Sequence, residues 1–539
     1  MYGSITLENR FGVNKMELIS LKYAIFVIVL LVLYYCFPKK YRWYVLLAGS
    51  MAYYVIICKW YVLFIIFTIC TTYGSTIWID KLLKKQNAVV KSHKEDWDRQ
   101  TRKEYKEKGR KKRVAAMLFA LLCNFGILAF LKYIPYAGEL GLLLPLGISF
   151  YTFQSMGYVM DVYREIVEPE KNFFKVALFV SFFPQIIQGP IAIYDKLAGQ
   201  LYEGHSLRLE NLQKGALLVL WGVMKKLVIA DRAVNIINFV MDKPMDFSGT
   251  YVFFAAVVYA LQLYADFSGG IDIVRGIAEM FGITMSTNFN HPYFSRSLTE
   301  YWHRWHMTLG DWCRNYIFYP LSISKRFLNF GKWLKPRFGA HISKVLPGCI
   351  ASVITFIVIG VWHGANMKYL YFGLWNGIVI MLAELFAPVN KKVSGGFFKL
   401  TGLREKGIFA TIVSVLWTFM LILVGYYFDI AANASTAFHM LFKSVTDFHI
   451  SELGINSIIL NLGACGLDEY DILLLIICTL LWFFISFVEE NKKLDMRDFI
   501  LSRKLPLRWS IIYLGIFIVI IFGYYGPGVN PADFVYMQF

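Results

Sequence analysis

The segment VLPGCIASVITFIVIGVWHGANMKYLYFGLWNGIVIMLAELF, residues 345–386, sets the expected fold. It consists of an almost wholly apolar run over 345–361, a short polar turn that contains His363, and a second, largely apolar run over 369–386. A helix needs about 20 apolar residues to cross a bilayer. We therefore predict two membrane helices joined near His363. An ionisable side chain at membrane depth is rare and is a functional candidate by default.

The composition extends this prediction to the whole chain. Of 539 residues, 57% are hydrophobic and 17% are aromatic, and the mean hydropathy is +0.50. Soluble domains are about 45–50% apolar, and the excess here is gathered into runs of bilayer length. The sequence thus predicts an all-α, polytopic membrane protein. The net charge of +18 does not indicate nucleic acid binding, because the basic residues cluster in loops between apolar runs, as in cytoplasmic loops.

The charges of the loops predict the topology. Segment 81–113 holds 14 Lys/Arg and 5 Asp/Glu, and we expect a solvated, partly helical cytoplasmic loop that faces anionic lipid. Between Asp429 and Tyr470 the only Lys or Arg is Lys443, so this segment is expected outside. Each span moves the chain to the opposite side of the membrane, so counting the expected spans from these loops places both the N-terminus and the C-terminus outside. Spans are expected near 20–37, 43–58, 60–79, 114–133, 141–161, 213–231, 249–266, 346–362, 368–388, 408–428, 471–488 and 509–525.

Two segments between 176 and 320 do not read as simple spans. The sequence Phe183-Pro-Gln-Ile-Ile-Gln-Gly-Pro190 interrupts an apolar run with two prolines and a glycine. Proline removes a backbone donor, and irregular backbone at membrane depth is tolerated only inside protein or beside a watery cavity. We therefore predict a broken or re-entrant element. Segment 264–319 is too polar to face lipid yet rich in aromatic residues, which predicts interfacial or buried helices.

Two histidines are the main candidates for chemistry. Histidine exchanges a proton near neutral pH better than any other side chain. As a neutral base, His363 could take a proton from a hydroxyl while that oxygen attacks a thioester. The alternative, favoured for a lone histidine, is a buried side chain hydrogen-bonded to a neighbouring helix. If 299–314 is helical, His303 and His306 lie one turn apart and share a face.

The residue patterns predict neither a metal site nor a disulfide framework. His303 and His306 form an H-x-x-H pair, but no HExxH motif or carboxylate pattern accompanies it. The eight cysteines lie mostly in apolar runs without C-x-x-C spacing, where cysteine behaves as a small hydrophobe. Trp302, Trp305 and Trp312 form an aromatic stripe, which is more often a packing surface or an interfacial anchor than a cofactor site.

A series of short motifs, in order along the chain, resembles the membrane-bound O-acyltransferase (MBOAT) family. One such motif is weakly specific, whereas the ordered series is highly specific. The resemblance runs from about residue 20 to the C-terminus, and it is nearest to the bacterial branch with the alginate O-acetylation membrane subunit and the teichoic acid D-alanyl transfer protein. The motifs are Leu144-Pro-Leu-Gly-Ile-Ser-Phe-Tyr-Thr-Phe-Gln154 with Asp161-Val-Tyr-Arg164, Phe183-Pro-Gln with Gly189-Pro190, Tyr264-Ala-Asp-Phe-Ser-Gly269, Asn288-Phe-Asn with Pro292-Tyr-Phe-Ser-Arg296, Trp302-His-Arg-Trp-His306 and Trp362-His-Gly-Ala-Asn366.

The resemblance implies a ring of roughly 11–13 transmembrane helices around a central funnel, with re-entrant and interfacial helices. It also implies that His363 is the catalytic histidine and His306 the second active-site histidine. His303 stands where the family usually has the first arginine of Trp-Arg-Arg-Trp-His, which puts in doubt any donor-phosphate contact of that arginine. The residues expected to bind substrate are Gln154, Gln188, Asn288, Trp302, His303, Arg304, Trp305 and Asn366.

The C-terminal tail carries a further resemblance. Asp533-Phe-Val-Tyr-Met-Gln-Phe539 is similar to the C-terminal motif of the small single-span partner in the D-alanyl system, where a tyrosine is proposed to carry the acyl group. The resemblance implies that Tyr536 is acylated and passes the group to an extracytoplasmic transferase of the SGNH type. A phenol, with a pKa of about 10, is a better leaving group than an aliphatic alcohol. The alternative is a tail that packs against the outer mouth of the funnel.

We divide the chain into five parts on this basis. They are the N-terminal transmembrane helices (1–80), the basic cytoplasmic loop (81–113), the MBOAT catalytic core (114–425), an acidic extracellular loop with the last transmembrane helices (426–525), and an extracellular tail (526–539).

The expected activity is that of a cell-membrane O-acyltransferase that moves an acyl group, most simply acetyl, from a cytoplasmic thioester to an envelope polysaccharide. The donor is acetyl-CoA or an acyl carrier protein, and no permanently bound cofactor or nucleic acid partner is expected. His363 is the base toward the acceptor hydroxyl, that of Tyr536, and His306 positions the thioester, stabilises the oxyanion, or only shapes the pocket. The alternatives are D-alanyl transfer to teichoic acid, a lipid- or protein-directed acyltransferase, and a transporter or flippase, which predicts a repeat symmetry that the sequence lacks.

Overall fold

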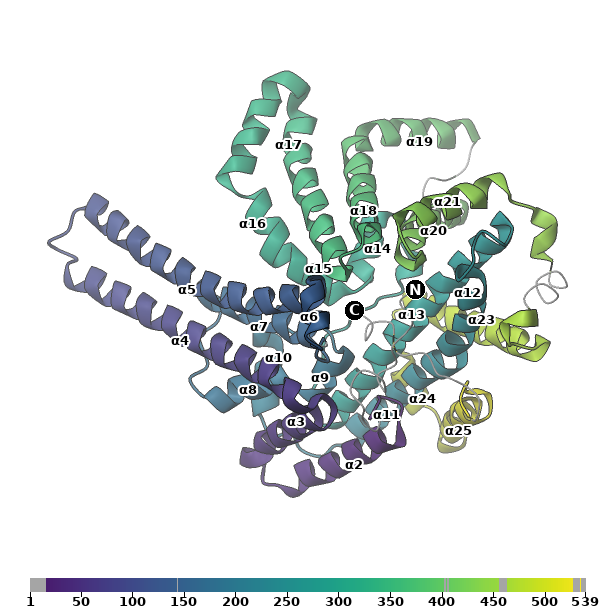
Figure 1. The fold of residues 1–539 in the computed structure, drawn as a ribbon, viewed down its shortest axis with the longest axis horizontal. Helices are drawn as coiled ribbons and strands as arrows, with labels where there is room; N and C mark the ends of the chain where they lie inside the picture. The colour runs from purple at the N-terminus through teal and green to yellow at the C-terminus, as the bar shows by residue number, and fades with distance from the viewer. Residues whose placement is uncertain are drawn as a thin grey trace. The chain divides into compact units, whose positions relative to one another are not determined.

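A computed structural model describes residues 16–142, 144–401, 404, 407–454, 463–526 and 534. All regular secondary structure within these ranges is helical, which confirms the all-α prediction (Figure 1). The chain forms two compact units. Unit 1 consists of Met1–Val219 and Ile271–Ser286, and unit 2 consists of Leu220–Gly270 and Thr287–Phe539.

The helices are those of a multi-pass membrane protein. Within the described ranges, seven helical segments are long and apolar enough to cross a bilayer, and a bent pair, Met367–Leu385 with Ala387–Gly396, would be an eighth. This number is below the expected 11 to 13 for two reasons. The runs near 20–37, 141–161 and 213–231 form helices of only 16 residues, α2 (Leu21–Cys36), α7 (Ile148–Tyr163) and α11 (Leu209–Met224). The expected spans 43–58 and 60–79 lie in one segment, Lys39–Ser92. The seven segments are Lys39–Ser92, Arg99–Tyr133, Gly249–Met280, Lys325–His363, Ile408–Ile430, Glu469–Lys492 and Leu505–Phe522.

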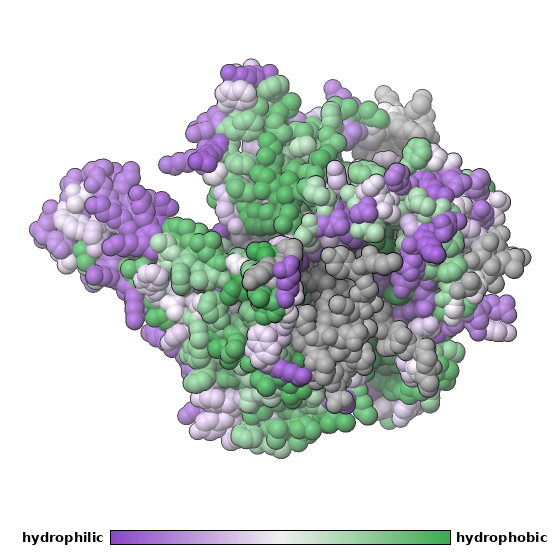
Figure 2. All heavy atoms as spheres, viewed as in Figure 1, coloured by the Kyte–Doolittle hydropathy of each residue, from purple (hydrophilic) through white to green (hydrophobic). Residues whose placement is uncertain are grey.

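Unit 1 contains a long antiparallel helix pair, α4 (Val62–Ser92) and α5 (Arg99–Tyr133), which also packs on α7 (Figure 1). The basic segment 81–113 lies almost wholly in these two helices, so that only residues 93–98 connect them. Asp98 begins α5 by accepting a hydrogen bond from the Thr101 backbone N–H at 2.9 Å, an N-cap. Hydrophilic residues gather at the tip of this pair (Figure 2). The remaining N-terminal helices are α2 (Leu21–Cys36) and α3 (Arg42–Cys58).

The proline-containing segment of unit 1 forms the broken element that the sequence predicts. Helix α8 (Phe173–Ser181) ends at Phe182, and the short α9 (Phe183–Gln188) follows before α10 (Tyr194–Tyr202). Residues 176–190 are all buried. The irregular backbone therefore lies inside protein, where its polar groups find partners: Gln185 Nε2 donates to the carbonyl oxygen of Pro190 at 2.5 Å.

Unit 2 holds the remaining helices. Between residues 281 and 324 the chain forms only short helical pieces, and most of the residues from Tyr293 to Cys313 are buried or half-buried. The helices are α12 (Asp231–Met241), α13 (Gly249–Met280, shared with unit 1), α14 (Leu298–Arg304), α15 (Met307–Cys313), α16 (Tyr319–Ser322), α17 (Lys325–His363), α18 (Met367–Leu385), α19 (Ala387–Thr401), α20 (Ile408–Ile430), α21 (Ala434–Thr446), α23 (Glu469–Lys492), α24 (Met496–Leu501) and α25 (Leu505–Phe522).

Helices α17 and α18 are the two predicted spans around His363. Small residues let their backbones approach closely, as is common between membrane helices. A Cβ atom at Gly360 would collide with the carbonyl oxygen of Tyr369, and one at Gly373 with that of Phe356. Helix α17 ends at His363, as expected, but it begins at Lys325, and Gly339 (φ 80°) interrupts its helical geometry. The close packing fixes the helix end that carries the histidine.

Candidate active site

His363 lies at the last position of α17, against the first turns of α18. Its ring is 5.9 Å from the ring of Tyr369 and 5.5 Å from that of Phe372, measured between centroids. The preceding residue, Trp362, is buried, whereas His363 is half-buried. The histidine is thus held by aromatic neighbours at the edge of a pocket that it lines.

His306 occupies the break between α14 and α15. Its backbone is left-handed, with φ 44°, which is uncommon for a residue other than glycine and is found at functional sites more often than elsewhere. Helix α14 ends at Arg304 and α15 begins at Met307, so residues 299–314 do not form the continuous helix on which a shared face for His303 and His306 depended. His303 is exposed and contacts Arg314, while His306 is 2% exposed. The two histidines therefore do not share a face.

Asn288 fixes the protonation of His306. The backbone N–H and the hydroxyl of Thr308 both donate to Asn288 Oδ1, at 3.1 and 2.8 Å, so this atom is the amide oxygen. His306 Nδ1 lies 3.2 Å from the same oxygen, which only accepts hydrogen bonds, so Nδ1 carries the proton. Burial, with a smaller contribution from the nearby His363, lowers the pKa of His306 to about 3. His306 is therefore a neutral imidazole with Nε2 as an acceptor.

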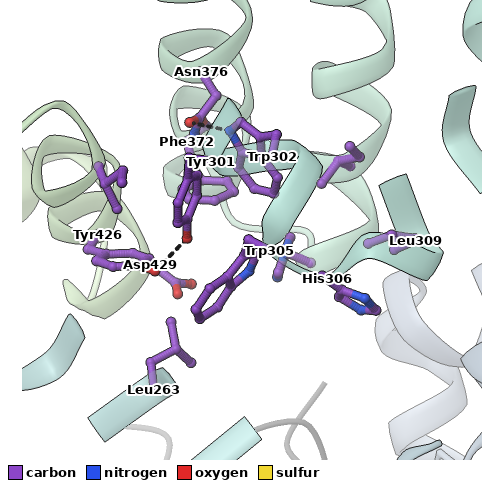
Figure 3. Close-up of a pocket in the computed structure, with 13 residues that line it drawn as sticks. Leu263, Tyr301, Trp302, Trp305, His306, Leu309, Phe372, Asn376, Tyr426 and Asp429 are labelled. Atoms are coloured by element: carbon purple, nitrogen blue, oxygen red, sulfur yellow. Dashed lines mark hydrogen bonds between the residues drawn. The ribbon is translucent and has the colours of Figure 1, made fainter. Parts of the chain in front are cut away.

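His306 and His363 both line one pocket of unit 2. The Trp362 ring lies near both, 6.3 Å from the His306 ring and 5.0 Å from the His363 ring, measured between centroids. Aromatic and aliphatic side chains form most of the wall (Figure 3). Such a wall excludes water and strengthens the few polar contacts inside. The other lining residues are Leu263, Tyr301, Trp302, Trp305, Leu309, Ile359, Phe372, Asn376, Ile422, Tyr426 and Asp429.

Hydrogen bonds tie the polar members of the wall to one another. Trp302 Nε1 donates to Asn376 Oδ1 at 3.0 Å, and the hydroxyls of Tyr301 and Tyr426 lie 2.7 Å apart (Figure 3). Asp429, on the last turn of α20, accepts a hydrogen bond from the Tyr259 hydroxyl at 2.7 Å. The wall thus connects α13, α14, α18 and α20.

Several of these wall residues were not predicted from the sequence. Asn376 lies within the apolar run of α18, and Asp429 lies where the apolar run of α20 ends. Both are polar groups at the level of predicted spans, a signal that could have identified them. Tyr301 and Tyr426 carried no signal that distinguishes them from the other tyrosines.

The expected substrate-binding residues fall into three groups. Trp302 and Trp305 line the histidine pocket, and Asn288 orients His306. Arg304 lies outside the pocket lining and pairs with Glu300 and Glu490, while the exposed Asn366 caps α18 by accepting from the Lys368 N–H at 3.0 Å. Gln154 and Gln188 belong to unit 1, and Tyr536 lies outside the described residues.

Gln154 and Gln188 are both buried within unit 1. Gln154 donates to the Phe179 carbonyl oxygen at 2.6 Å and accepts from Gln185 Nε2 at 2.5 Å. Gln188 is 0% exposed, and its side-chain amide has no hydrogen-bond partner within the described part of the chain. Across the same part, no group of three His, Cys, Asp or Glu side chains is arranged to hold a metal ion.

Comparison with known proteins gives a family match over part of the chain. Residues 169–335, which include His306, match the membrane-bound O-acyltransferase family. The chain contains an MBOAT domain. His363 lies beyond the matched residues, on the helix that follows them.

Curated proteins similar to this chain act on different polymers, by their names. A probable alginate O-acetylase of Pseudomonas syringae is 30% identical over 58% of this chain and 54% of its own length. A peptidoglycan O-acetyltransferase of Helicobacter pylori is 29% identical over 51% and 56%. A teichoic acid D-alanyltransferase of Bacillus subtilis is 26% identical over 52% and 67%. The chain therefore spans just over half the length of the O-acetylases that it matches.

Proposed function

We propose that this protein is an integral-membrane O-acyltransferase that moves an acyl group, acetyl in the simplest case, from a cytoplasmic thioester to an extracytoplasmic polysaccharide. The observation that carries the proposal is the convergence of His306 and His363 in one aromatic-walled pocket beside an MBOAT match. O-acetylase relatives support acetyl as the group and a polysaccharide or peptidoglycan as the acceptor. D-alanyl transfer is the second candidate, because a D-alanyltransferase is also among the relatives.

In the proposed first step, the acceptor hydroxyl is the phenol of Tyr536. His363 takes the phenol proton as the oxygen attacks the thioester carbonyl, which forms the C–O bond. The C–S bond then breaks, and His363 returns the proton to the leaving thiolate. The products are a tyrosyl ester and a free thiol, so atoms and charge balance.

His306 has a different role from His363 in this scheme. Its Nδ1–H is bound to Asn288, and Nε2 is an acceptor that would repel, rather than stabilise, a developing oxyanion. We therefore propose that His306 accepts a hydrogen bond and orients the attacking hydroxyl or His363. This role differs from the three that the sequence suggested, which were positioning the thioester, stabilising the oxyanion and shaping the pocket.

In the second proposed step, an extracytoplasmic serine transferase of the SGNH type attacks the tyrosyl ester. The serine oxygen forms a new ester and the Tyr536 phenol is released with its proton, which resets the carrier. The polysaccharide hydroxyl then attacks the seryl ester. The carrier step requires the tail to be outside the cell membrane, as the loop charges predict.

Labelled acetyl-CoA and labelled aminoacyl carrier protein test the proposal when each is supplied to membranes that contain the protein, its SGNH-type transferase and the envelope polymer. One of the two should label the polymer, and His363→Ala should reduce labelling by about 10²–10⁴-fold, as expected for loss of a general base. His439→Ala, an exposed histidine on α21, is the matched control and should keep wild-type activity. Wild-type labelling in the His363→Ala protein would refute the assignment.

A further inference from the structure

A second buried polar centre lies in unit 2, at the π-helical turn Lys225–Ala230 between α11 and α12. Lys226 Nζ lies 2.8 Å from an oxygen of Asp231 and 2.6 Å from an oxygen of Asp266. The three side chains are at most 3% exposed. Burying charges costs several kcal/mol per ion before pairing offsets it, and π-helical turns are frequent at functional sites. This lysine cluster, Lys226 with Asp231 and Asp266, is therefore a candidate for a binding role.

An aromatic side chain from the C-terminal tail covers the lysine cluster. Phe534 is 4% exposed, and Lys226 Nζ lies 4.4 Å from the centre of its ring. A desolvated ammonium over an aromatic face is attracted by the ring quadrupole, and burial increases this attraction. A cation at this position favours an aromatic ring over an aliphatic side chain of similar size.

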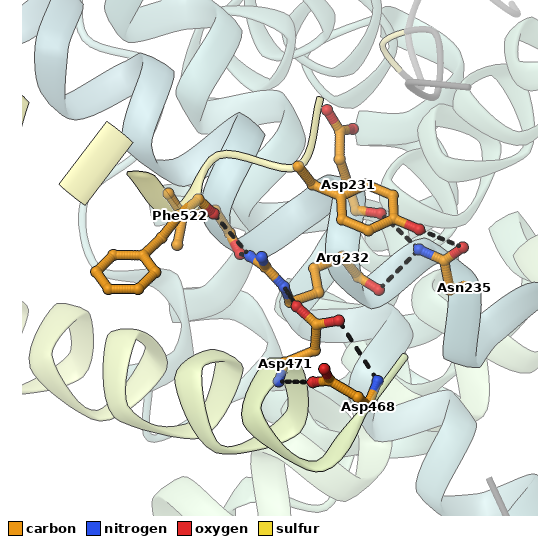
Figure 4. A network of polar contacts seen from close by, with 8 residues as sticks. Asp231, Arg232, Asn235, Asp468, Asp471 and Phe522 are labelled. Atoms are coloured by element: carbon orange, nitrogen blue, oxygen red, sulfur yellow. Dashed lines mark hydrogen bonds and ion pairs between the residues drawn. The ribbon is translucent and has the colours of Figure 1, made fainter. Parts of the chain in front are cut away.

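The chain that leads into the tail is attached to the same turn. The Tyr524 N–H donates to the Leu227 carbonyl oxygen at 2.9 Å, and the Tyr524 hydroxyl donates to Asn235 Oδ1 at 3.3 Å. Arg232, paired with Asp471 at 2.8 Å, donates to the carbonyl oxygen of Phe522 at 3.1 Å (Figure 4). The tail is thus attached near its start and again at Phe534.

The lysine cluster lies beside the histidine pocket along α13. Asp266 precedes Phe267, whose ring is 4.9 Å from that of His306. Tyr536 follows Phe534 by two residues in the sequence. The contact of Phe534 with Lys226 therefore attaches the chain two residues before the proposed carrier tyrosine.

We propose that the lysine cluster is a seat for the Phe534 ring and that Lys226 is a positioning residue for the acylation of Tyr536. The positioning role of Lys226 rests on the proposed function, in which Tyr536 is the acyl carrier. The seat for the Phe534 ring rests only on the contacts of Lys226. Asp231 and Asp266 hold the ammonium beside the ring, and the contacts of Tyr524 attach the chain that precedes the tail to the same turn.

Hydrogen exchange of the tail peptide 526–539 in the full-length protein tests the seat without reference to activity. Phe534→Leu removes the quadrupole but keeps an apolar side chain, and it should speed exchange about tenfold. Phe534→Trp keeps an aromatic face and should retain protection. Lys226→Arg keeps the charge and should also retain it. Unchanged protection in Phe534→Leu would overturn the proposal.

A charge-neutral variant separates the seat from folding. Lys226→Met alone leaves two buried carboxylates without their cation, whereas Lys226→Met combined with Asp231→Asn and Asp266→Asn removes all three charges. The triple variant should show wild-type helicity with a fast-exchanging tail, and a slow-exchanging tail in it would contradict the seat.

Mass spectrometry of the same tail peptide after donor addition distinguishes this proposal from the proposed function. Loss of tail protection together with loss of acyl-Tyr536 in Phe534→Leu supports both. A protected tail that is never acylated in the wild type, while the polymer is labelled, refutes the carrier role and leaves the seat standing. Lost acylation with full protection in Phe534→Leu refutes the seat.

Discussion

Unit 2 buries two polar centres in opposite ways. In the histidine pocket, His306 is neutral: its Nδ1–H donates a hydrogen bond to Asn288 Oδ1, and aromatic rings surround its imidazole. The lysine cluster keeps its groups charged and pairs Lys226 with two carboxylates. A neutral imidazole can accept and return a proton, whereas a fully paired ion cluster holds its charge. The difference fits the two proposed roles, which are chemistry in the pocket and binding of Phe534 at the cluster.

The largest expected effect on stability separates the lysine cluster from surface ion pairs. Lys226→Met should lower the free energy of unfolding by about 3–5 kcal/mol, because it leaves buried carboxylates without a cation. Lys84→Met removes an exposed pair with Asp80 and should cost about 0–1 kcal/mol. Denaturant unfolding in detergent measures both. Equal small losses would show that the cluster is not an ion pair shielded from solvent.

The pocket should respond to acid in a defined pH range. The pKa of His306 is lowered to about 3 in the folded protein by burial, against about 6.5 when unfolded, so the unfolded state binds more protons between these values. The contribution of the neutral His306 to the free energy of unfolding should therefore be complete above pH 6.5, and it should be lost progressively as the pH decreases toward 3. His306→Gln should make this fall shallower in thermal unfolding scans. An unchanged pH dependence in that variant would mean that His306 is not buried as a neutral base.

A smaller effect is expected at the aromatic wall of the pocket. Trp302→Phe keeps the ring but removes the hydrogen bond to Asn376, which should cost about 0.5–1.5 kcal/mol of stability. Trp333→Phe, at an exposed position on α17, should cost less than 0.5 kcal/mol or so. Thermal unfolding compares the two. A larger loss at Trp333 would contradict the contrast between a hydrogen-bonded wall and an exposed surface.

The sequence predicted features that depend on composition along one segment. Apolar runs of bilayer length predicted α17, α18, α20 and α23, and the prolines of 183–190 predicted the break between α8 and α9. The left-handed backbone at His306 was not predictable, because the contacts of Asn288 and Thr308 hold it. The sequence did place both histidines in one site through a family resemblance. It could not place Asp429, which reaches the pocket from a helix distant in the chain.

The lysine cluster also could not be predicted from the sequence. Lys226 lies inside the predicted span near 213–231, where burying a lysine in the membrane costs free energy and therefore marks a candidate functional residue. Its partners Asp231 and Asp266 come from different helices, and Phe534 comes from the far end of the chain. Only the folded arrangement shows that these four residues meet.

The most direct test of the account is the mass of the C-terminal peptide after a single turnover with acyl donor. The account predicts an acyl group on Tyr536 in the wild-type protein, its absence in His363→Ala, and its presence at wild-type level in the His439→Ala control. Polymer acylation that proceeds with an unmodified Tyr536, or full acylation of Tyr536 in the His363→Ala protein, would contradict it.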